Sequence, residues 1–394
     1  MLPTQLTCRG TLSAFGRFRR RPARCSGLQM LLEQEEPRSA TIRRSLLPSV
    51  VHARRRFSVS AAAIVNAAPG PVRPYLRLMR LDKPIGTWLL YLPCSWSIAL
   101  AAEPGCLPDL GTLALFGAGA VLMRGAGCTV NDMWDKELDR KVGRTAARPI
   151  ACGDVSRPQA LVFLGGQLSL ALGVLLCLNS YSMALGAASL SLVLTYPLMK
   201  RITHWPQLVL GEWRSAPPRP PAVRLLPVSL GCHWSPGLTF NWGALLGWAA
   251  VRGACDWSVC LPLYFSGVMW TLIYDTIYAH QDKEDDIKAG VGSTALRLAE
   301  RTKPWLSGFG AAMTAGLAAA GLQAGQGGPY YVALAAVAFH LARQISTLDV
   351  DDPEDCWKKF VSNRNLGLLL LLGIVAGNLW KERPEAGPQR TPSN

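Results

Sequence analysis

One segment of the chain, residues 84–102, reads PIGTWLLYLPCSWSIALAA. It contains no charged residue, and it is bounded by Asp82 and Lys83 on one side and by Glu103 on the other. About 20 apolar residues in a helix are enough to cross the hydrocarbon core of a bilayer, which is roughly 30 Å thick. The segment therefore predicts a transmembrane helix.

Eight further long, largely apolar runs follow this segment, and together with it they predict nine transmembrane helices. They cover residues 110–128, 159–178, 180–199, 237–251, 257–281, 304–322, 329–347 and 365–380. The composition agrees, because 49% of the 394 residues are hydrophobic and only 17% are charged, whereas soluble domains carry about 25% charged residues. The sequence thus predicts an all-α integral membrane protein and excludes a disordered chain.

The basic residues are sorted between the two sides of these predicted helices. The loops after the second, fourth, sixth and eighth runs are rich in Lys and Arg, whereas the loops on the other side contain one basic residue, Arg252. This asymmetry is what the positive-inside rule predicts for correctly counted spans. A soluble protein with buried helices has no reason to sort its charges by alternate loops.

The first 70 residues have the composition of a mitochondrial targeting sequence. Residues 1–70 contain twelve Arg, no Lys and three acidic residues, and they are expected to be a mostly disordered presequence. A basic arm that binds nucleic acid or anionic lipid is the less favoured alternative, so no nucleic-acid partner is expected. Import places the protein in the mitochondrial inner membrane, with its positive side facing the matrix. Residues 382–394 are expected to be a disordered tail.

An acidic cluster follows the second predicted span. Residues 131–139 read NDMWDKELD, and if the helix continues, Asp132, Asp135 and Asp139 stand at positions i, i+3 and i+7. Residues at this spacing share one face of a helix. On its own, such a pattern is equally well explained by a solvated helix end with scattered ion pairs.

A second acidic cluster ends the sixth span, on the same predicted side of the membrane. Residues 274–286 read YDTIYAHQDKEDD, which places Asp275, Asp282 and Asp286 along one stripe. Crowded carboxylates at a membrane boundary are costly unless they are neutralised. Mg²⁺ prefers oxygen ligands and usually binds through one or two carboxylates together with substrate phosphates. Two such stripes therefore indicate a diphosphate held between them through Mg²⁺.

These motifs and their order resemble those of the UbiA-type intramembrane prenyltransferases. The matching segments are residues 80–86 (RLDKPIG), 131–139, 144–149 (RTAARP), 196–201 (YPLMKR), 274–286 and 293–294. The similarity runs from about residue 73 to residue 381, so residues 71–381 are expected to form one prenyltransferase domain. The resemblance implies a nine-helix bundle around a central cavity that opens sideways to lipid.

The resemblance also implies roles for individual residues. The metal and diphosphate site is expected to consist of Asn131, Asp132, Asp135, Asp139, Asp282 and Asp286. Asp275 lies one turn deeper and is expected to stabilise an allylic cation. Lys200 is a candidate to bind the diphosphate and Arg201 to bind the carboxylate of the acceptor, and Arg80 and Arg148 are alternatives for either role. Three tyrosines could offer aromatic faces to the cation or equally serve as interfacial anchors, namely Tyr196, Tyr274 and Tyr278.

Within this family, the details imply transfer of a polyprenyl group from polyprenyl diphosphate to 4-hydroxybenzoate in ubiquinone biosynthesis. The same fold with another acceptor, such as haem or a naphthoquinone precursor, is an alternative. Association with other ubiquinone-biosynthesis proteins stays open. A transporter should hold its carboxylates near the bilayer midplane, and a soluble prenyl-chain synthase lacks the nine spans. Both are disfavoured.

The chain departs from the family pattern between its fourth and fifth predicted spans. Residues 212–236 form an insert with six prolines, which is not expected to form a regular spanning helix. We interpret the insert as the product of an alternative transcript or of a misassembled gene model, rather than as a regulatory lid. Because Lys200 and Arg201 precede it, the insert could reduce activity, so an isoform of low activity is a further alternative.

Overall fold

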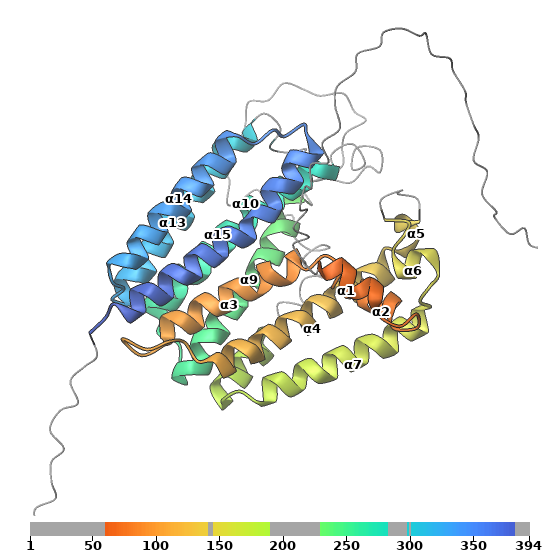
Figure 1. The fold of residues 1–394 in the computed structure, drawn as a ribbon, viewed down its shortest axis with the longest axis horizontal. Coiled ribbons are helices and arrows are strands. Elements are labelled where there is room, and N and C mark those ends of the chain that lie inside the picture. The colour runs from red at the N-terminus through yellow and green to blue at the C-terminus, as the bar shows by residue number, and fades with distance from the viewer. Residues whose placement is uncertain (1–59, 141–144, 190–228, 283–297, 299–300, 383–394) are drawn as a thin grey trace, which may run out of the picture. The chain divides into compact units, whose positions relative to one another are not determined.

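The computed structural model describes residues 60–140, 145–189, 229–282, 298 and 301–382 (Figure 1). All of these residues belong to one compact unit, residues 58–394. Within the described ranges the secondary structure is helical, without a strand. The prediction of an all-α protein is confirmed for this part of the chain.

Figure 1 labels the helices by their order in the chain. Their bounds are α1 Ala61–Ala67, α2 Arg73–Leu78, α3 Ile85–Ala101, α4 Leu110–Trp134, α5 Lys136–Asp139, α6 Pro149–Cys152, α7 Arg157–Leu176, α9 Ser229–Arg252, α10 Trp257–Ala279, the short 3₁₀ helix η2 His280–Asp282, α13 Thr302–Gln323, α14 Gly328–Ser346 and α15 Pro353–Leu379. Residues 180–189 are also helical.

Five of these helices are long and apolar enough to cross a membrane by length and composition, namely α4, α7, α10, α13 and α15. The apolar helix α3 is shorter. Each of the nine predicted runs overlaps a helical segment, although the run 180–199 is described only as far as residue 189. The structure therefore supports several membrane-crossing helices, and the count of nine remains a prediction.

Polar residues fix the starts of several long helices. The Asp109 carboxylate accepts a hydrogen bond of 2.6 Å from the backbone N–H of Thr112 and so caps α4. The hydrogen bonds from Thr112 lower the pKa of Asp109. Ser156 and Gln159 form a reciprocal capping box at α7. Such caps satisfy backbone N–H groups that have no partner in the first turn of a helix.

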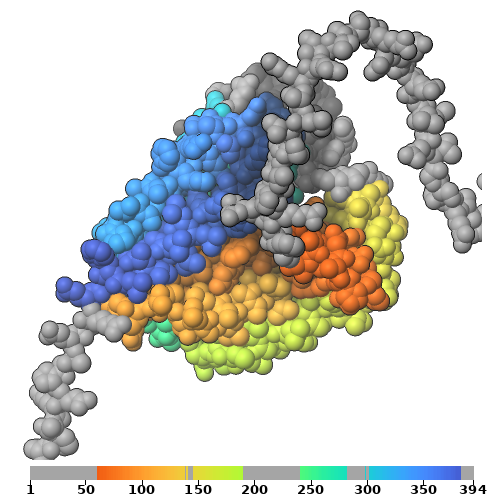
Figure 2. Space-filling view, in the orientation of Figure 1, coloured from red at the N-terminus to blue at the C-terminus, as the bar shows by residue number. Residues whose placement is uncertain are grey.

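The core centres on α3, α10 and α15. Trp96 and Trp270 are fully buried, and their ring centroids lie 5.0 Å apart. Each indole N–H donates to α15, Trp96 to the carbonyl of Gly367 at 2.9 Å and Trp270 to the side-chain oxygen of Asn363 at 3.0 Å. A Cβ atom at Gly367 would approach Leu92 to 2.5 Å, so glycine allows α15 to pack closely on α3. The two helices adjoin in Figure 2.

The helix α7 presents an apolar surface instead of burying one. Its exposed side chains include Leu161, Val162, Leu170 and Leu176, and it runs along one margin of the surface in Figure 2. Exposed leucines in such number are unfavourable in water but suit contact with lipid. This observation agrees with a membrane environment for the helices.

Two helices begin inside the predicted presequence and the predicted insert, respectively. The helix α1 lies within residues 1–70, and Val65 is buried while Arg77 donates a hydrogen bond of 3.0 Å to Asn66. The described part of the chain thus includes a helix in the last ten residues of the predicted presequence, whose bounds stay a prediction. Similarly, α9 begins at Ser229, so the last eight residues of the stretch 212–236 are helical. Five of the six prolines in that stretch precede Ser229, which is why a helix can start there.

Candidate functional site

Arg80 lies between α2 and α3 and reaches the end of α4. One of its terminal nitrogens, Nη2, donates to both carboxylate oxygens of Asp132, at 2.8 and 2.9 Å. Its φ of 59° is the single positive φ of a non-glycine residue in the described ranges. This left-handed conformation is uncommon for a residue with a Cβ. The backbone here is therefore held in a strained conformation that directs the guanidinium to Asp132.

A second arginine joins the same network. Arg148 precedes α6, and its Nη1 donates to the two carboxylate oxygens of Asp139 at 2.9 and 2.8 Å and to Asp132 at 3.4 Å. Thr145 donates to the backbone carbonyl of Asp139 at 3.0 Å, which links the segment before α6 to the end of α5. Asp132 is 1% exposed and the arginine side chains are 22% and 25% exposed. Two arginines thus neutralise two buried carboxylates.

The helical hydrogen-bond pattern continues beyond α4 into α5. The backbone N–H of Asp135 donates to the carbonyl of Asn131 at 2.9 Å, and that of Asp139 donates to Asp135 at 2.8 Å. Asn131, Asp135 and Asp139 therefore repeat every four residues on one side of the helix. Asn131 is exposed and Asp135 is half-buried. Asp132 is one position further round and is directed into the network with Arg80, so metal binding by Asp132 stays a prediction.

The second half of the predicted site lies at the end of α10. Tyr274 is buried, and its hydroxyl lies 3.1 Å from that of Thr271, which accepts a hydrogen bond of 2.8 Å from Asn241. Tyr278 is half-buried and packs on Phe360, with ring centroids 4.9 Å apart. Asp275 is half-buried on the same helix, between the two tyrosines.

Several predicted site residues cannot be placed. Asp282 ends η2, and only its backbone is described. Four others lie outside the described residues, namely Tyr196, Lys200, Arg201 and Asp286. The structure therefore brings together Arg80, Arg148, Asp132 and Asp139, while the roles predicted for the other residues remain predictions.

The two acidic clusters lie at the same end of the helices. Arg80, which precedes α3, contacts Asp132 near the carboxyl end of α4, so α3 and α4 run antiparallel. Leu100 near the carboxyl end of α3 lines a pocket together with Val259 in the first turn of α10. The helix α10 is therefore also antiparallel to α3, and α4 and α10 both finish near the amino end of α3.

The structure adds a residue that the sequence analysis passed over, Arg124. It lies inside the membrane-crossing helix α4, and its Nε is buried without a hydrogen-bond partner in the described ranges. No described carboxylate lies within 4 Å of it. A Cβ on Gly86 would come within 2.5 Å of this Nε, and the charge of Arg124 acts on the Tyr274 hydroxyl. A lone cation in the apolar run 110–128 was the signal that could have identified it.

The described side chains contain no group of three or more His, Cys, Asp or Glu that could bind a metal ion. The donors on the α4–α5 stripe, however, are an exposed amide and two carboxylates, of which that of Asp139 accepts two hydrogen bonds from Arg148. Amide and carboxylate oxygens are ligands that Mg²⁺ prefers. Their number also fits a metal that completes its shell with substrate phosphates and water. The residues present thus fit half of a Mg²⁺–diphosphate site.

The chain belongs to the UbiA prenyltransferase family, whose model matches residues 90–218 and 221–371. The resemblance found in the sequence is thereby confirmed. The chain is 66% identical over 84% of its length to "4-hydroxybenzoate polyprenyltransferase, mitochondrial" of Homo sapiens, covering 82% of that protein. It is 52% identical to the protein of the same name from Caenorhabditis elegans, over 82% of this chain and 83% of the relative.

Solved structures show the same fold. A UbiA homologue from Aeropyrum pernix K1 superposes with a TM-score of 0.53 at 24% identity, over 74% of this chain and 96% of that one. A UbiA homologue from Archaeoglobus fulgidus, bound to DMAPP and Mg²⁺, superposes with a TM-score of 0.56 at 17% identity, over 77% of this chain and 98% of that one. At these identities the likeness concerns the fold.

Proposed function

We propose that this chain transfers a polyprenyl group from polyprenyl diphosphate to the ring carbon ortho to the hydroxyl of 4-hydroxybenzoate, in ubiquinone biosynthesis. The C–O bond of the allylic diphosphate breaks, a C–C bond to the ring forms, and the ring carbon loses its proton while diphosphate leaves. The observation that carries this proposal is the 66% identity to a relative with that name over most of both chains. The arginines of the arginine–aspartate network have further N–H donors that suit the phosphate oxygens of such a leaving group.

Arg80 and Arg148 are the candidates to bind the diphosphate. Each contacts a carboxylate through one nitrogen, Nη2 in Arg80 and Nη1 in Arg148, and a guanidinium has five N–H donors that suit phosphate oxygens. The metal ligands would be Asn131, Asp132, Asp135, Asp139, Asp282 and Asp286. These residues would hold Mg²⁺, which when bound would supply positive charge for the departing diphosphate. The arginines hold the leaving group in position beside the α4–α5 stripe.

Arg124 is our candidate to bind the carboxylate of 4-hydroxybenzoate, alongside the earlier candidates Lys200 and Arg201. Arg124 forms no ion pair with a described carboxylate, its Nε is buried without a hydrogen bond in the described ranges, and an anionic substrate group would neutralise this charge. Arg124 lies two turns deeper than Asp132 on α4. A carboxylate bound there would orient the acceptor ring below the diphosphate, where the allylic carbon must lie.

Arg124→Gln is expected to raise the KM for 4-hydroxybenzoate about tenfold or more, because a hydrogen bond to a charged group contributes about 1.5–3 kcal/mol. The KM for polyprenyl diphosphate should change little. Steady-state kinetics in membranes with each substrate varied in turn would measure both. Arg364→Gln on α15 is the control, since the Arg364 guanidinium bonds only to the neighbouring Asn365 in the described ranges. An equal rise in both KM values contradicts the assignment.

Aromatic groups on α10 and α15 are candidates to shield the allylic cation from water. Tyr274 and Tyr278 both pack on Phe360, at centroid distances of 6.0 and 4.9 Å. Aromatic faces attract cations, and excluding water prevents capture of the intermediate. Asp275 lies between the tyrosines along α10 and would stabilise the positive charge. Tyr196 is assigned the same shielding role.

The membrane arrangement completes the proposal. Nine spans around a central cavity open to lipid would let the polyprenyl tail enter from the bilayer. The sorting of basic residues places the acidic clusters on the matrix side of the mitochondrial inner membrane. The relatives' names support a mitochondrial location.

The test of the proposed function is Mg²⁺-dependent transfer of a labelled polyprenyl group to 4-hydroxybenzoate by membranes that contain this chain. A haem or naphthoquinone precursor is the competing acceptor, and preferential labelling of either would refute the assignment.

Deletion of Glu212–Pro236 is expected to preserve or raise prenyl transfer. The deletion joins Gly211 to Gly237, which removes the first eight residues of α9 but keeps the predicted span 237–251 intact. Complementation of a yeast strain that lacks this activity, with membrane abundance measured in parallel, would check the outcome. Loss of activity at normal abundance would instead show that the insert contributes to function.

A further inference from the structure

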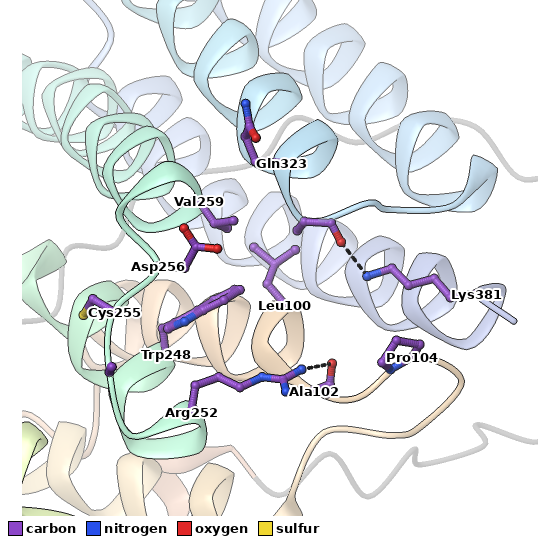
Figure 3. Close-up of a pocket in the computed structure, with 12 residues that line it drawn as sticks. Leu100, Ala102, Pro104, Trp248, Arg252, Cys255, Asp256, Val259, Gln323 and Lys381 are labelled. Carbon is purple, nitrogen blue, oxygen red and sulfur yellow. Dashed lines mark hydrogen bonds between the residues drawn. The ribbon is translucent and has the colours of Figure 1, made fainter. Parts of the chain in front are cut away.

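A pocket of about 510 Å³ lies at the end of the helices opposite the acidic clusters (Figure 3). It is formed where α3, α9 and α13 end and α10 begins, beside the residue that follows the cap of α15. The α3 helix, which has Arg80 before its first turn and Leu100 of the pocket in its last, is roughly 25 Å long at 1.5 Å per residue. The pocket is therefore separate from the proposed prenyl-transfer site.

Two cations line this pocket from different helix ends. Arg252 ends α9 and donates to the carbonyl of Ala102 at 3.3 Å, while the Lys381 ammonium donates to the carbonyl of Ala324 at 2.7 Å. Figure 3 shows both side chains directed inward. Arg252 is the single basic residue in the loops between the predicted spans on this side, and Lys381 is the first basic residue after the last span.

Capping of helix ends accounts for only part of this arrangement. Each cation uses one donor on a carbonyl that ends a helix, which is favourable, yet an arginine has five donors and a lysine three. No described carboxylate lies within 4 Å of either. Asp256 also lines the pocket, but its carboxylate accepts hydrogen bonds from Ser258 at the start of α10. Burial, followed by repulsion from Arg252, lowers the pKa of Lys381. Neither cation therefore has an anionic partner among the residues that the structure describes.

The surroundings of the pocket indicate that the anion belongs to a lipid. Trp257 is 49% exposed beside Asp256, and Trp380 is 73% exposed beside Lys381. Exposed tryptophans at the ends of apolar helices are typical of the headgroup level of a bilayer. Within the pocket, Trp248 and Val259 belong to the buried core, so the exposed apolar surface is that of the two tryptophans beside it. A free phosphate would use the cations but leave these tryptophans uncovered.

We propose that this pocket binds an anionic phospholipid, whose phosphate lies between Arg252 and Lys381 and whose acyl chains cover the adjoining apolar surface. A phosphate between two cations forms charge-assisted hydrogen bonds, which are stronger than neutral ones. A choline headgroup would bring a positive charge toward the two cations. The pocket should therefore distinguish phosphatidylglycerol from phosphatidylcholine with the same acyl chains.

The test uses the full chain in neutral detergent micelles, with the thermal unfolding midpoint followed as each lipid is added. We expect an apparent affinity for phosphatidylglycerol about tenfold or more above that for phosphatidylcholine. In Arg252→Gln/Lys381→Gln this preference should disappear, since each charged hydrogen bond accounts for about a tenfold change or more. The matched control is Arg157→Gln/Lys303→Gln, which removes two exposed cations at the other end of the helices and should keep the preference.

A second variant keeps both charges, so that the test does not depend on the folding of the double variant. Ala254 lines the pocket and is exposed, so Ala254→Trp should fill the space and abolish the preference. Equal affinity for the two lipids in the wild type overturns the proposal. A preference for phosphatidylglycerol that survives in both Ala254→Trp and the Arg252/Lys381 variant also overturns it. So does a result in which inorganic phosphate alone shifts the unfolding midpoint as phosphatidylglycerol does. None of these outcomes depends on prenyl transfer, so the proposed function is tested separately.

Discussion

Asp135→Ala is expected to abolish detectable prenyl transfer while the protein stays in the membrane at normal abundance. Asp135 ends α4 and lies on the stripe with Asn131 and Asp139, and its side chain is half-buried. Its backbone hydrogen bond to Asn131 does not need the carboxylate, so the helix end should survive. Loss of a group that stabilises charge in the transition state costs about a hundredfold to a thousandfold in kcat. Asp282→Ala should have the same effect from the α10 side.

A charge change nearby provides the control for these variants. Glu137→Ala removes a carboxylate that is 70% exposed and forms a 3.5 Å ion pair with Arg140. This variant should leave turnover nearly unchanged. Titration with Mg²⁺ gives a second readout, because a weakened metal site needs more Mg²⁺ to reach half-maximal rate. Near-normal turnover at ordinary Mg²⁺ in Asp135→Ala or Asp282→Ala removes that residue from the metal site.

The sequence predicts the helices well because a membrane-crossing helix needs a long apolar run, which local composition reveals directly. It also predicts the acidic clusters and their common end, since alternate spans must reverse direction. It does not predict which of the carboxylates are paired with an arginine. Asp132 and Asp135 are three residues apart, yet the first is buried against Arg80, which lies 52 residues earlier in the chain. Only tertiary structure decides which carboxylate is paired with an arginine.

Arg124 and the pocket at the opposite end show the same limit. A single arginine in an apolar run looks like a tolerated exception in the sequence, and its environment at Gly86 and Tyr274 comes from two other helices. Arg252 and Lys381 are 129 residues apart in the sequence, and they line the same pocket because α9 and α15 end at the same end of the helices. The starting points of α1 and α9 were missed for a different reason, because their first turns lack the long apolar run that identifies a span.

Arg80→Gln is expected to lower the stability of the folded chain by about 3 kcal/mol, because it leaves a buried carboxylate with one distant partner. Asp132 is 1% exposed, and without Arg80 its remaining ion pair is the 3.4 Å contact with Arg148. The thermal unfolding midpoint in detergent should fall by several degrees. Arg140→Gln is the control, since Arg140 is 48% exposed and exposed ion pairs contribute about 0–1 kcal/mol.

The double variant Arg80→Gln/Asp132→Asn separates a structural role of Arg80 from a role in binding diphosphate. It removes both charges and keeps groups that can form a hydrogen bond, so most of the lost stability should return. If Arg80 also binds the diphosphate, the KM for polyprenyl diphosphate should be tenfold or more higher in the stable double variant than in Asp132→Asn alone, which already lacks a proposed metal ligand. Recovery of stability together with a KM equal to that of Asp132→Asn would leave Arg80 with a structural role alone. The diphosphate would then be bound by Arg148 and by the residues between α10 and α13.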